Sequence, residues 1–136
     1  MKHFFMTLTI AAVGLTLSCS KPAGNPFLGR WDMTVTTAQE QFPSWMEVTE
    51  TNGTLEARVQ QRTGNVNPAA SVERDGEKLI VTVAAAVPAR PATENRPAMP
   101  ERPALIWELT EEGGRLTGTQ SRGSETFQLV GVRAPA

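Results

Sequence analysis

The chain has 136 residues, of which 40% are apolar and 20% are charged, so it is long enough for one globular domain and too apolar for a disordered chain. Its formal charge of -1 provides no overall positive field, so we expect no nucleic-acid partner. A single Cys and a single His exclude an intramolecular disulfide and a His-rich metal site, so we expect no metal and no cofactor.

The first residues have the pattern of an export signal. A short basic start, Met1-Lys2-His3, is followed by an uncharged apolar run from residue 4 to residue 17, and then by Ser18-Cys19-Ser20. The apolar run is shorter than the roughly 20 residues that a transmembrane helix needs. The sequence therefore favours a cleaved signal over a membrane-spanning anchor.

Residues 15–19, Leu-Thr-Leu-Ser-Cys, resemble a bacterial lipobox, in which the Cys becomes the lipidated first residue of the mature protein. The resemblance implies a lipoprotein signal peptide at 1–18, acylation of Cys19 and a lipid-anchored tether at 19–26. Because Ser20 and not Asp follows, it also implies the outer membrane, facing the periplasm. The alternative is an ordinary signal peptide with an incidental Cys. A chain cleaved before Cys19 has no His, no Tyr and no free thiol, so we expect no enzyme.

From Phe27 onward, apolar and polar residues alternate with the two-residue period of strands that bury one face. Together with further strands expected at 70–74, 115–120 and 125–133, the total is about eight strands. Asn52-Gly53 has the composition of a two-residue hairpin turn. The residues expected to face inward are Trp31, Met33 and Val35; Met46 and Val48; Leu55, Ala57 and Val59; Leu79, Val81 and Val83; and Leu105, Trp107 and Leu109.

No 11-residue window of the mature chain keeps a helical stripe, and eight antiparallel strands must protect their edges. Residues 27–136 are therefore expected to form an all-β, antiparallel, eight-stranded up-and-down barrel, with a β-sandwich as the alternative. The large apolar residues that face inward favour a filled barrel over a hollow one.

One segment, residues 87–103, interrupts the alternation with five Pro and three Arg. Proline cannot donate to a strand ladder, so we expect an extended, partly polyproline II excursion with a charge of +1. It is either a mobile surface loop or a lid or docking segment. No internal sequence repeat is expected.

Gly29-Arg30-Trp31 opens the first strand, and Arg133 lies near the end of the last strand. This pattern is similar to the lipocalin signature. The resemblance implies that Gly29, Trp31 and Arg133 form the barrel floor, with the guanidinium packed over the indole, a contact that contributes roughly 0.5–2 kcal/mol.

Several short phrases of the chain carry a second resemblance. They are Gly29-Arg30-Trp31-Asp32, Pro43-Ser44-Trp45-Met46-Glu47-Val48, Arg58 with Arg62-Thr63-Gly64 and Pro68, and Gly131-Val132-Arg133-Ala134-Pro135. Together they resemble a small lipocalin-like β domain that accompanies bacterial 3-keto-disaccharide hydrolase domains. We expect the domain to stand alone here, as a lipoprotein without the hydrolase domain.

Within this resemblance, Trp45, Arg58 and Arg62 are the candidate binding residues. Strand alternation predicts that they share one outer surface, on which an indole and guanidinium groups suit a sugar or a carboxylate. Alternatively, Trp45 covers a barrel end and the two Arg pair with Glu47 or Glu56 on neighbouring strands.

Five Glu on strands and turns offer paired carboxylates for a glycosidase, but such residues usually form a solvated face. The sequence therefore predicts an exported, lipid-anchored, non-catalytic barrel. Its expected partners are the membrane, through the lipid anchor, and a small apolar or carbohydrate ligand. The alternative is an accessory or interaction module for a glycan-processing enzyme such as a 3-keto-disaccharide hydrolase.

Overall fold

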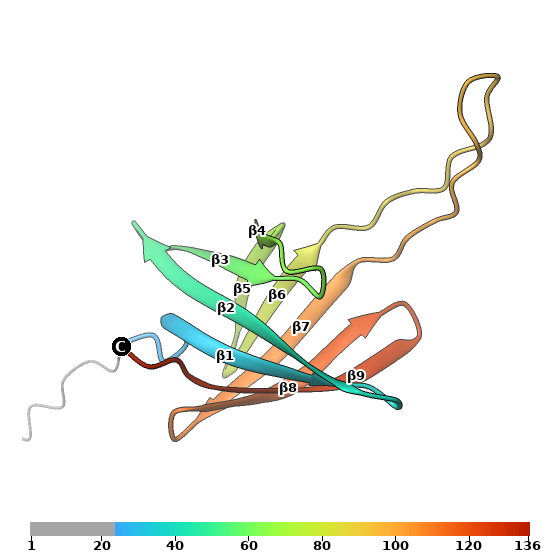
Figure 1. Ribbon diagram of the computed structural model, residues 1–136. Coiled ribbons are helices and arrows are strands. Elements are labelled where there is room, and N and C mark those ends of the chain that lie inside the picture. The colour runs from blue at the N-terminus through green and yellow to red at the C-terminus, as the bar shows by residue number, and fades with distance from the viewer. Residues whose placement is uncertain (1–23) are drawn as a thin grey trace, which may run out of the picture.

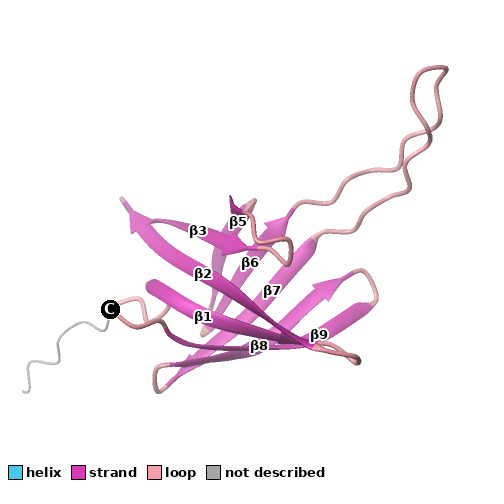
Figure 2. Ribbon diagram, in the orientation of Figure 1, coloured by secondary structure: helices cyan, strands magenta, loops and turns pink. Residues whose placement is uncertain are grey.

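A computed structural model describes residues 24–136, so the expected signal peptide and Cys19 lie outside the described residues. Figure 2 shows the strands and loops of this part, in which no helix is long and apolar enough to cross a membrane. Residues 24–136 form nine strands: β1 (Gly29–Thr36), β2 (Gln41–Thr51), β3 (Thr54–Gln60), β4 (Val66–Pro68), β5 (Ser71–Asp75), β6 (Lys78–Ala84), β7 (Leu105–Glu112), β8 (Arg115–Arg122) and β9 (Glu125–Arg133).

The strands form one antiparallel sheet in the order β4-β3-β2-β1-β9-β8-β7-β6-β5 (Figure 1). Strands that are neighbours in the chain pair with each other, and β1 also pairs with β9. The sheet curls on itself, so the expected all-β, up-and-down, lipocalin-like architecture is confirmed. Eight strands were expected, and β4 is the additional one.

The two ends of the strand order meet at Ala69 and Ala70, which separate β4 from β5. The Ala69 N–H donates to the Ala57 carbonyl of β3 at 2.8 Å, and the Ala70 N–H donates to the Thr82 carbonyl of β6 at 2.7 Å. The chain thus steps from one edge of the sheet to the other within one peptide unit. Strand β4 exists because of this pairing with β3, since it buries none of its side chains. Joined edges leave less unpaired backbone for association with other chains.

The alternation of the strands builds the core as expected. Leu55 and Leu105, both expected inside, lie at the starts of β3 and β7 and are only half-buried, although they pack against the core. The buried core residues are Phe27, Trp31, Met33, Val35, Met46, Val48, Ala57, Val59, Leu79, Val81, Val83, Trp107, Leu109, Leu116 and Leu129.

The turn between β2 and β3 has the conformation that its sequence predicts. Asn52 and Gly53 have φ angles of 52° and 78°, both in the left-handed region. Two residues of this conformation match the twist of a two-residue hairpin, and Asn and Gly adopt it at the lowest cost.

The barrel floor is built on Trp31. The indole is fully buried, and its Nε1 donates to the Phe27 carbonyl at 2.8 Å. The Arg133 guanidinium carbon lies 3.9 Å from the centroid of the Trp31 ring, and Arg133 also donates to the carbonyls of Pro26 and Leu28. Arg133 therefore binds the segment that precedes β1 and covers the indole at the same time.

Gly29 makes room for this contact. Its φ angle is 109°, and a Cβ at this position would lie 2.9 Å from Nη1 of Arg133. Any other residue would be strained by the backbone and crowded by the guanidinium. Gly29, Trp31 and Arg133 therefore depend on one another.

Residues 85–104 connect β6 to β7 as an arm that extends away from the barrel (Figure 1). The arm pairs with itself, and each pair exchanges two backbone hydrogen bonds of 2.8–3.2 Å. The pairs are Val87 with Arg102, Arg90 with Met99, and Thr93 with Arg96.

The paired residues of the arm are three positions apart, and the sequence has the same period. From residue 87 to residue 104 it reads Val-Pro-Ala, Arg-Pro-Ala, Thr-Glu-Asn, Arg-Pro-Ala, Met-Pro-Glu, Arg-Pro-Ala. A polyproline II strand has three residues per turn, so every third residue presents its N–H and C=O to the same side. Proline takes the second place of five triplets, where its missing N–H removes no hydrogen bond. The expectation of no internal repeat is therefore wrong for this segment.

A register shift in the sheet directly precedes the arm. The β6–β7 ladder is regular up to Thr82 with Ile106, and then shifts so that Ala84 pairs with Leu105. The next pair, Val87 with Arg102, lies three residues further along each strand. The change from the two-residue to the three-residue period is made at this irregularity.

The floor contact predicts two unequal losses of stability. Trp31→Ala should lower the free energy of unfolding by about 3–5 kcal/mol through lost burial. Arg133→Lys should lower it by roughly 0.5–2 kcal/mol, because an ammonium cannot lie flat on an indole. Urea denaturation measures both, with Arg115→Lys, on the exposed start of β8, as the control. If Arg133→Lys is as stable as the unmodified chain, the stacked pair does not support the floor.

Candidate functional site

A cavity of about 400 Å³ opens at the end of the barrel opposite the Trp31 floor. It lies where β1, β3, β6 and β8 end and where β2, β7 and β9 begin. Its volume falls within the range of about 300–1,000 Å³ that is usual for small-molecule sites. Its lining residues are Val35, Thr37, Gln39, Glu40, Phe42, Ser44, Val59, Gln60, Gln61, Arg62, Val83, Leu105, Trp107, Gln120, Arg122, Glu125 and Phe127.

The inner wall of the cavity is apolar. Val35, Val59, Val83 and Trp107 are buried and also belong to the core. The aromatic rings of Phe42 and Phe127 and the side chain of Leu105 are half-buried and continue this wall toward the opening. An apolar body that enters from the open end would therefore lose contact with water on several sides.

The lower part of the barrel is filled with side chains. Met33, Met46, Leu79, Leu116 and Leu129 are exposed by 2% or less. The expectation of a filled barrel therefore holds for the half next to Trp31, and the cavity is confined to the other half.

A few polar groups face this apolar wall. The Trp107 indole donates from Nε1 to Oε1 of Gln120 at 2.8 Å. Ser44, which is 7% exposed, donates from Oγ to the Gln60 carbonyl at 2.6 Å. Nε of Arg122 is buried and has no hydrogen-bond partner among the described residues. Buried polar groups normally have partners, so the Arg122 nitrogen is an unsatisfied donor at the wall of the cavity.

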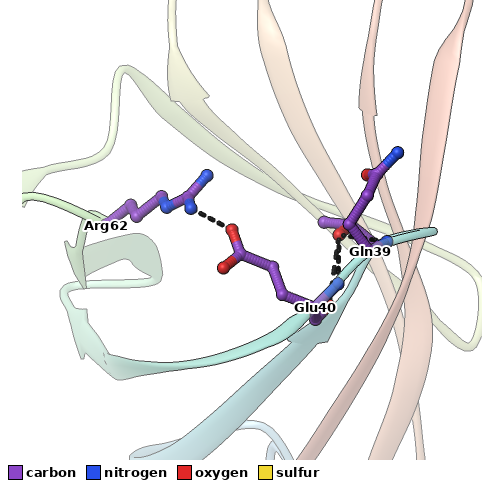
Figure 3. Close-up of polar contacts among 4 residues, drawn as sticks. Gln39, Glu40 and Arg62 are labelled. Carbon is purple, nitrogen blue, oxygen red and sulfur yellow. Dashed lines mark hydrogen bonds and ion pairs between the residues drawn. The ribbon is translucent and has the colours of Figure 1, made fainter.

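The rim of the cavity is organised by an ion pair. Figure 3 shows Arg62 extended toward Glu40, with which it forms this pair. The Arg62 guanidinium carbon also lies 5.2 Å from the centroid of the Phe42 ring. The Thr37 hydroxyl accepts from the Glu40 N–H at 3.1 Å and from the Gln39 N–H at 3.3 Å, which orders the turn that carries Glu40.

Two of the three candidate binding residues are brought together on the outer face of the sheet. Trp45 and Arg58 line a shallow hollow of about 660 Å³ outside the barrel. The Arg30 guanidinium carbon lies 5.1 Å from the centroid of the Trp45 ring, and Arg30 also pairs with Glu47 at 3.8 Å. The half-buried Trp45 therefore faces outward as expected, with a guanidinium beside its ring.

Arg62 does not belong to this outer surface, so the expectation of one surface for all three residues is wrong. Strand β3 ends at Gln60, and alternation does not extend beyond it. The Gln61 N–H donates to the Asn65 carbonyl at 2.9 Å, and this turn directs Arg62 to the rim of the cavity.

Sequence reasoning missed the cavity, although β8 carries a signal for it. Leu116 is buried, and residues at positions 118, 120 and 122 share its face because side chains alternate along a strand. Gln120 and Arg122 are therefore polar residues on an inward face. Polar residues in inward positions break the binary pattern, and such breaks are expected at functional sites.

Comparisons of the chain with protein-family models, with curated proteins and with solved structures found no match. The resemblance to the domain that accompanies 3-keto-disaccharide hydrolases stays a prediction. The cavity and the outer hollow are therefore the features of the molecule that bear on its function.

Trp45 and Trp31 are expected to differ strongly in their importance for stability. Trp45→Ala should lower the free energy of unfolding by less than about 1.5 kcal/mol, because a partly exposed side chain leaves no core cavity when it is truncated. Urea denaturation of Trp45→Ala and Trp31→Ala side by side measures the difference. Equal losses would show that Trp45 is a packing residue.

Proposed function

We propose that this chain is an exported, lipid-anchored protein whose barrel binds a small, mainly apolar ligand in the cavity at its open end, without catalysing a reaction. The observation that carries the proposal is the cavity of about 400 Å³ with walls formed by Val35, Val59, Val83 and Trp107. A filled lower barrel supports it, because close packing beneath a cavity holds its walls in one shape.

The location rests on the N-terminal sequence. The export pattern and the lipobox-like residues 15–19 support a tethered barrel at the outer membrane, facing the periplasm. A barrel held at a membrane surface would meet ligands that leave or enter the lipid phase. An anchored barrel with an apolar cavity suits binding or transfer of such molecules.

A second candidate function uses the outer hollow around Trp45 and Arg58. A half-buried indole that faces outward next to guanidinium groups suits a glycan or a protein partner, which would make the domain an accessory module of a glycan-processing enzyme. Arg30 beside the Trp45 ring leaves less open ring for a sugar to stack on. The two functions are separable, because Trp45→Ala should abolish glycan or partner binding and leave cavity binding unchanged.

Filling the cavity should remove ligand binding. Val83 is buried in the cavity wall, so Val83→Phe should place a ring where the ligand would lie. We expect the affinity for the neutral fluorescent probe N-phenyl-1-naphthylamine to fall by roughly tenfold or more, which corresponds to about 1.4 kcal/mol.

Val132→Phe is the matched control, because Val132 is 46% exposed on the outer face and the same side chain is added there. Probe titration, with circular dichroism to show that both variants fold, makes the comparison. If neither variant changes probe binding, or if the unmodified chain binds no probe, the cavity is not a ligand site.

The lipid anchor predicts dependence on Cys19. The chain without substitutions should incorporate labelled palmitate and stay with membranes in high salt, because two or more acyl chains hold a protein firmly. Cys19→Ala should abolish the labelling. Cell fractionation and palmitate labelling test the prediction. Removal of the Cys19-containing chain from membranes by high salt would contradict it.

A further inference from the structure

We infer that the ligand of the cavity is an amphiphile with an anionic head group, a carboxylate or a group of the same charge, held by Arg122 and Gln120 at the inner edge of the opening. The inference rests on the proposed function, since it names the chemical class of the ligand for the same cavity. It is carried by the placement of hydrogen-bond donors on an otherwise apolar wall.

The first donor is Arg122. Its Nε is buried and without a partner in the described part of the chain, and the two ion pairs found there, Arg30 with Glu47 and Arg62 with Glu40, do not include it. A guanidinium carries its positive charge at neutral pH and presents donors in a fixed planar arrangement. That arrangement matches the two oxygens of a carboxylate.

The second donor is Gln120, two residues before Arg122 on the same face of β8. Its Oε1 accepts from the Trp107 indole at 2.8 Å, so the group that Gln120 can offer a ligand is its amide NH₂. Both side chains therefore present donors at the cavity, and a head group made of acceptors is complementary to them.

The apolar wall begins directly beside these donors. In the β7–β8 ladder, Leu105 is the partner of Arg122 and Trp107 is the partner of Gln120. Side chains of directly paired residues lie about 4.5–5.5 Å apart at Cβ. A head group on the donors would therefore continue directly into a body that packs on Leu105 and Trp107 of β7 and on Val83 of the neighbouring strand β6.

The other charged side chains at the opening do not offset the attraction of Arg122 for an anion. Glu40 is neutralised by Arg62, so neither provides a free charge. Glu125 is the register partner of Arg122 and is exposed, so water screens its carboxylate more than it screens a buried guanidinium nitrogen. Among the lining residues, Arg122 therefore provides the least screened unpaired charge.

The test compares three probes with the same ten-carbon body and different heads: decanoate, decanol and decyltrimethylammonium. Each is titrated calorimetrically into the full chain carrying Cys19→Ala, so that no attached acyl chain competes for the cavity. We expect decanoate to bind more tightly than decanol by roughly ten- to a hundredfold, the usual effect of charged hydrogen bonds. Decyltrimethylammonium should bind more weakly than decanol.

The variants assign this preference to Arg122. Arg122→Gln should lower the affinity for decanoate until it is close to the affinity for decanol. Arg122→Lys should keep part of the preference for decanoate, since it retains the charge and loses the planar donors. Arg115→Gln is the matched control, because Arg115 is exposed at the opposite end of β8.

The outcomes separate the inference from the proposed function. Equal binding of the three probes, or an unchanged preference in Arg122→Gln, overturns the anionic head and leaves the apolar cavity as a site. If decyltrimethylammonium binds more tightly than decanoate, Glu125 and not Arg122 sets the charge preference at the opening, and the inference is overturned. No binding of any probe to the unmutated cavity overturns the proposed function itself.

Discussion

The contact between Arg133 and Trp31 gives the barrel two different ends. The guanidinium covers the indole at 3.9 Å and donates to the chain that precedes β1, so the first and last strands close one end together. Large apolar side chains then fill the space above Trp31. Packing of this density leaves no room for a ligand near the floor, so the unfilled volume lies at the other end. The site is thus a consequence of how the opposite end is closed.

The inward face of the sheet changes character along the barrel. Along β2 the inward residues change from Met46 to Ser44, and along β8 they change from Leu116 to Gln120 and Arg122. Placing polar groups on an inward face costs free energy unless they have partners. Gln120 and Ser44 have partners within the barrel, whereas the Arg122 nitrogen has none among the described residues. The unpartnered Arg122 nitrogen is the observation on which the proposed head-group site rests.

Two backbone periods meet in this chain. The barrel strands have the two-residue period that lets one face be buried, and the arm has the three-residue period of polyproline II. The register shift at Thr82 and Ala84 lies where they join, and the arm extends away from the barrel (Figure 1). None of the residues of the arm, 85–104, lines the cavity. Its prolines do not prevent pairing, because they occupy positions whose N–H would not face the other side of the arm.

Local patterns in the sequence determined the strands, the Asn52-Gly53 turn, the inward residues and the fold class, because alternation and turn conformation depend on neighbouring residues only. They also placed Trp45 correctly on the outer face. Tertiary structure decided the rest. Alternation states which face a side chain is on, but its depth along the barrel depends on register between strands distant in the chain. For that reason local sequence did not predict three features that depend on the curled and joined sheet. They are the pairing of β4, the turn that redirects Arg62 and the cavity around Arg122.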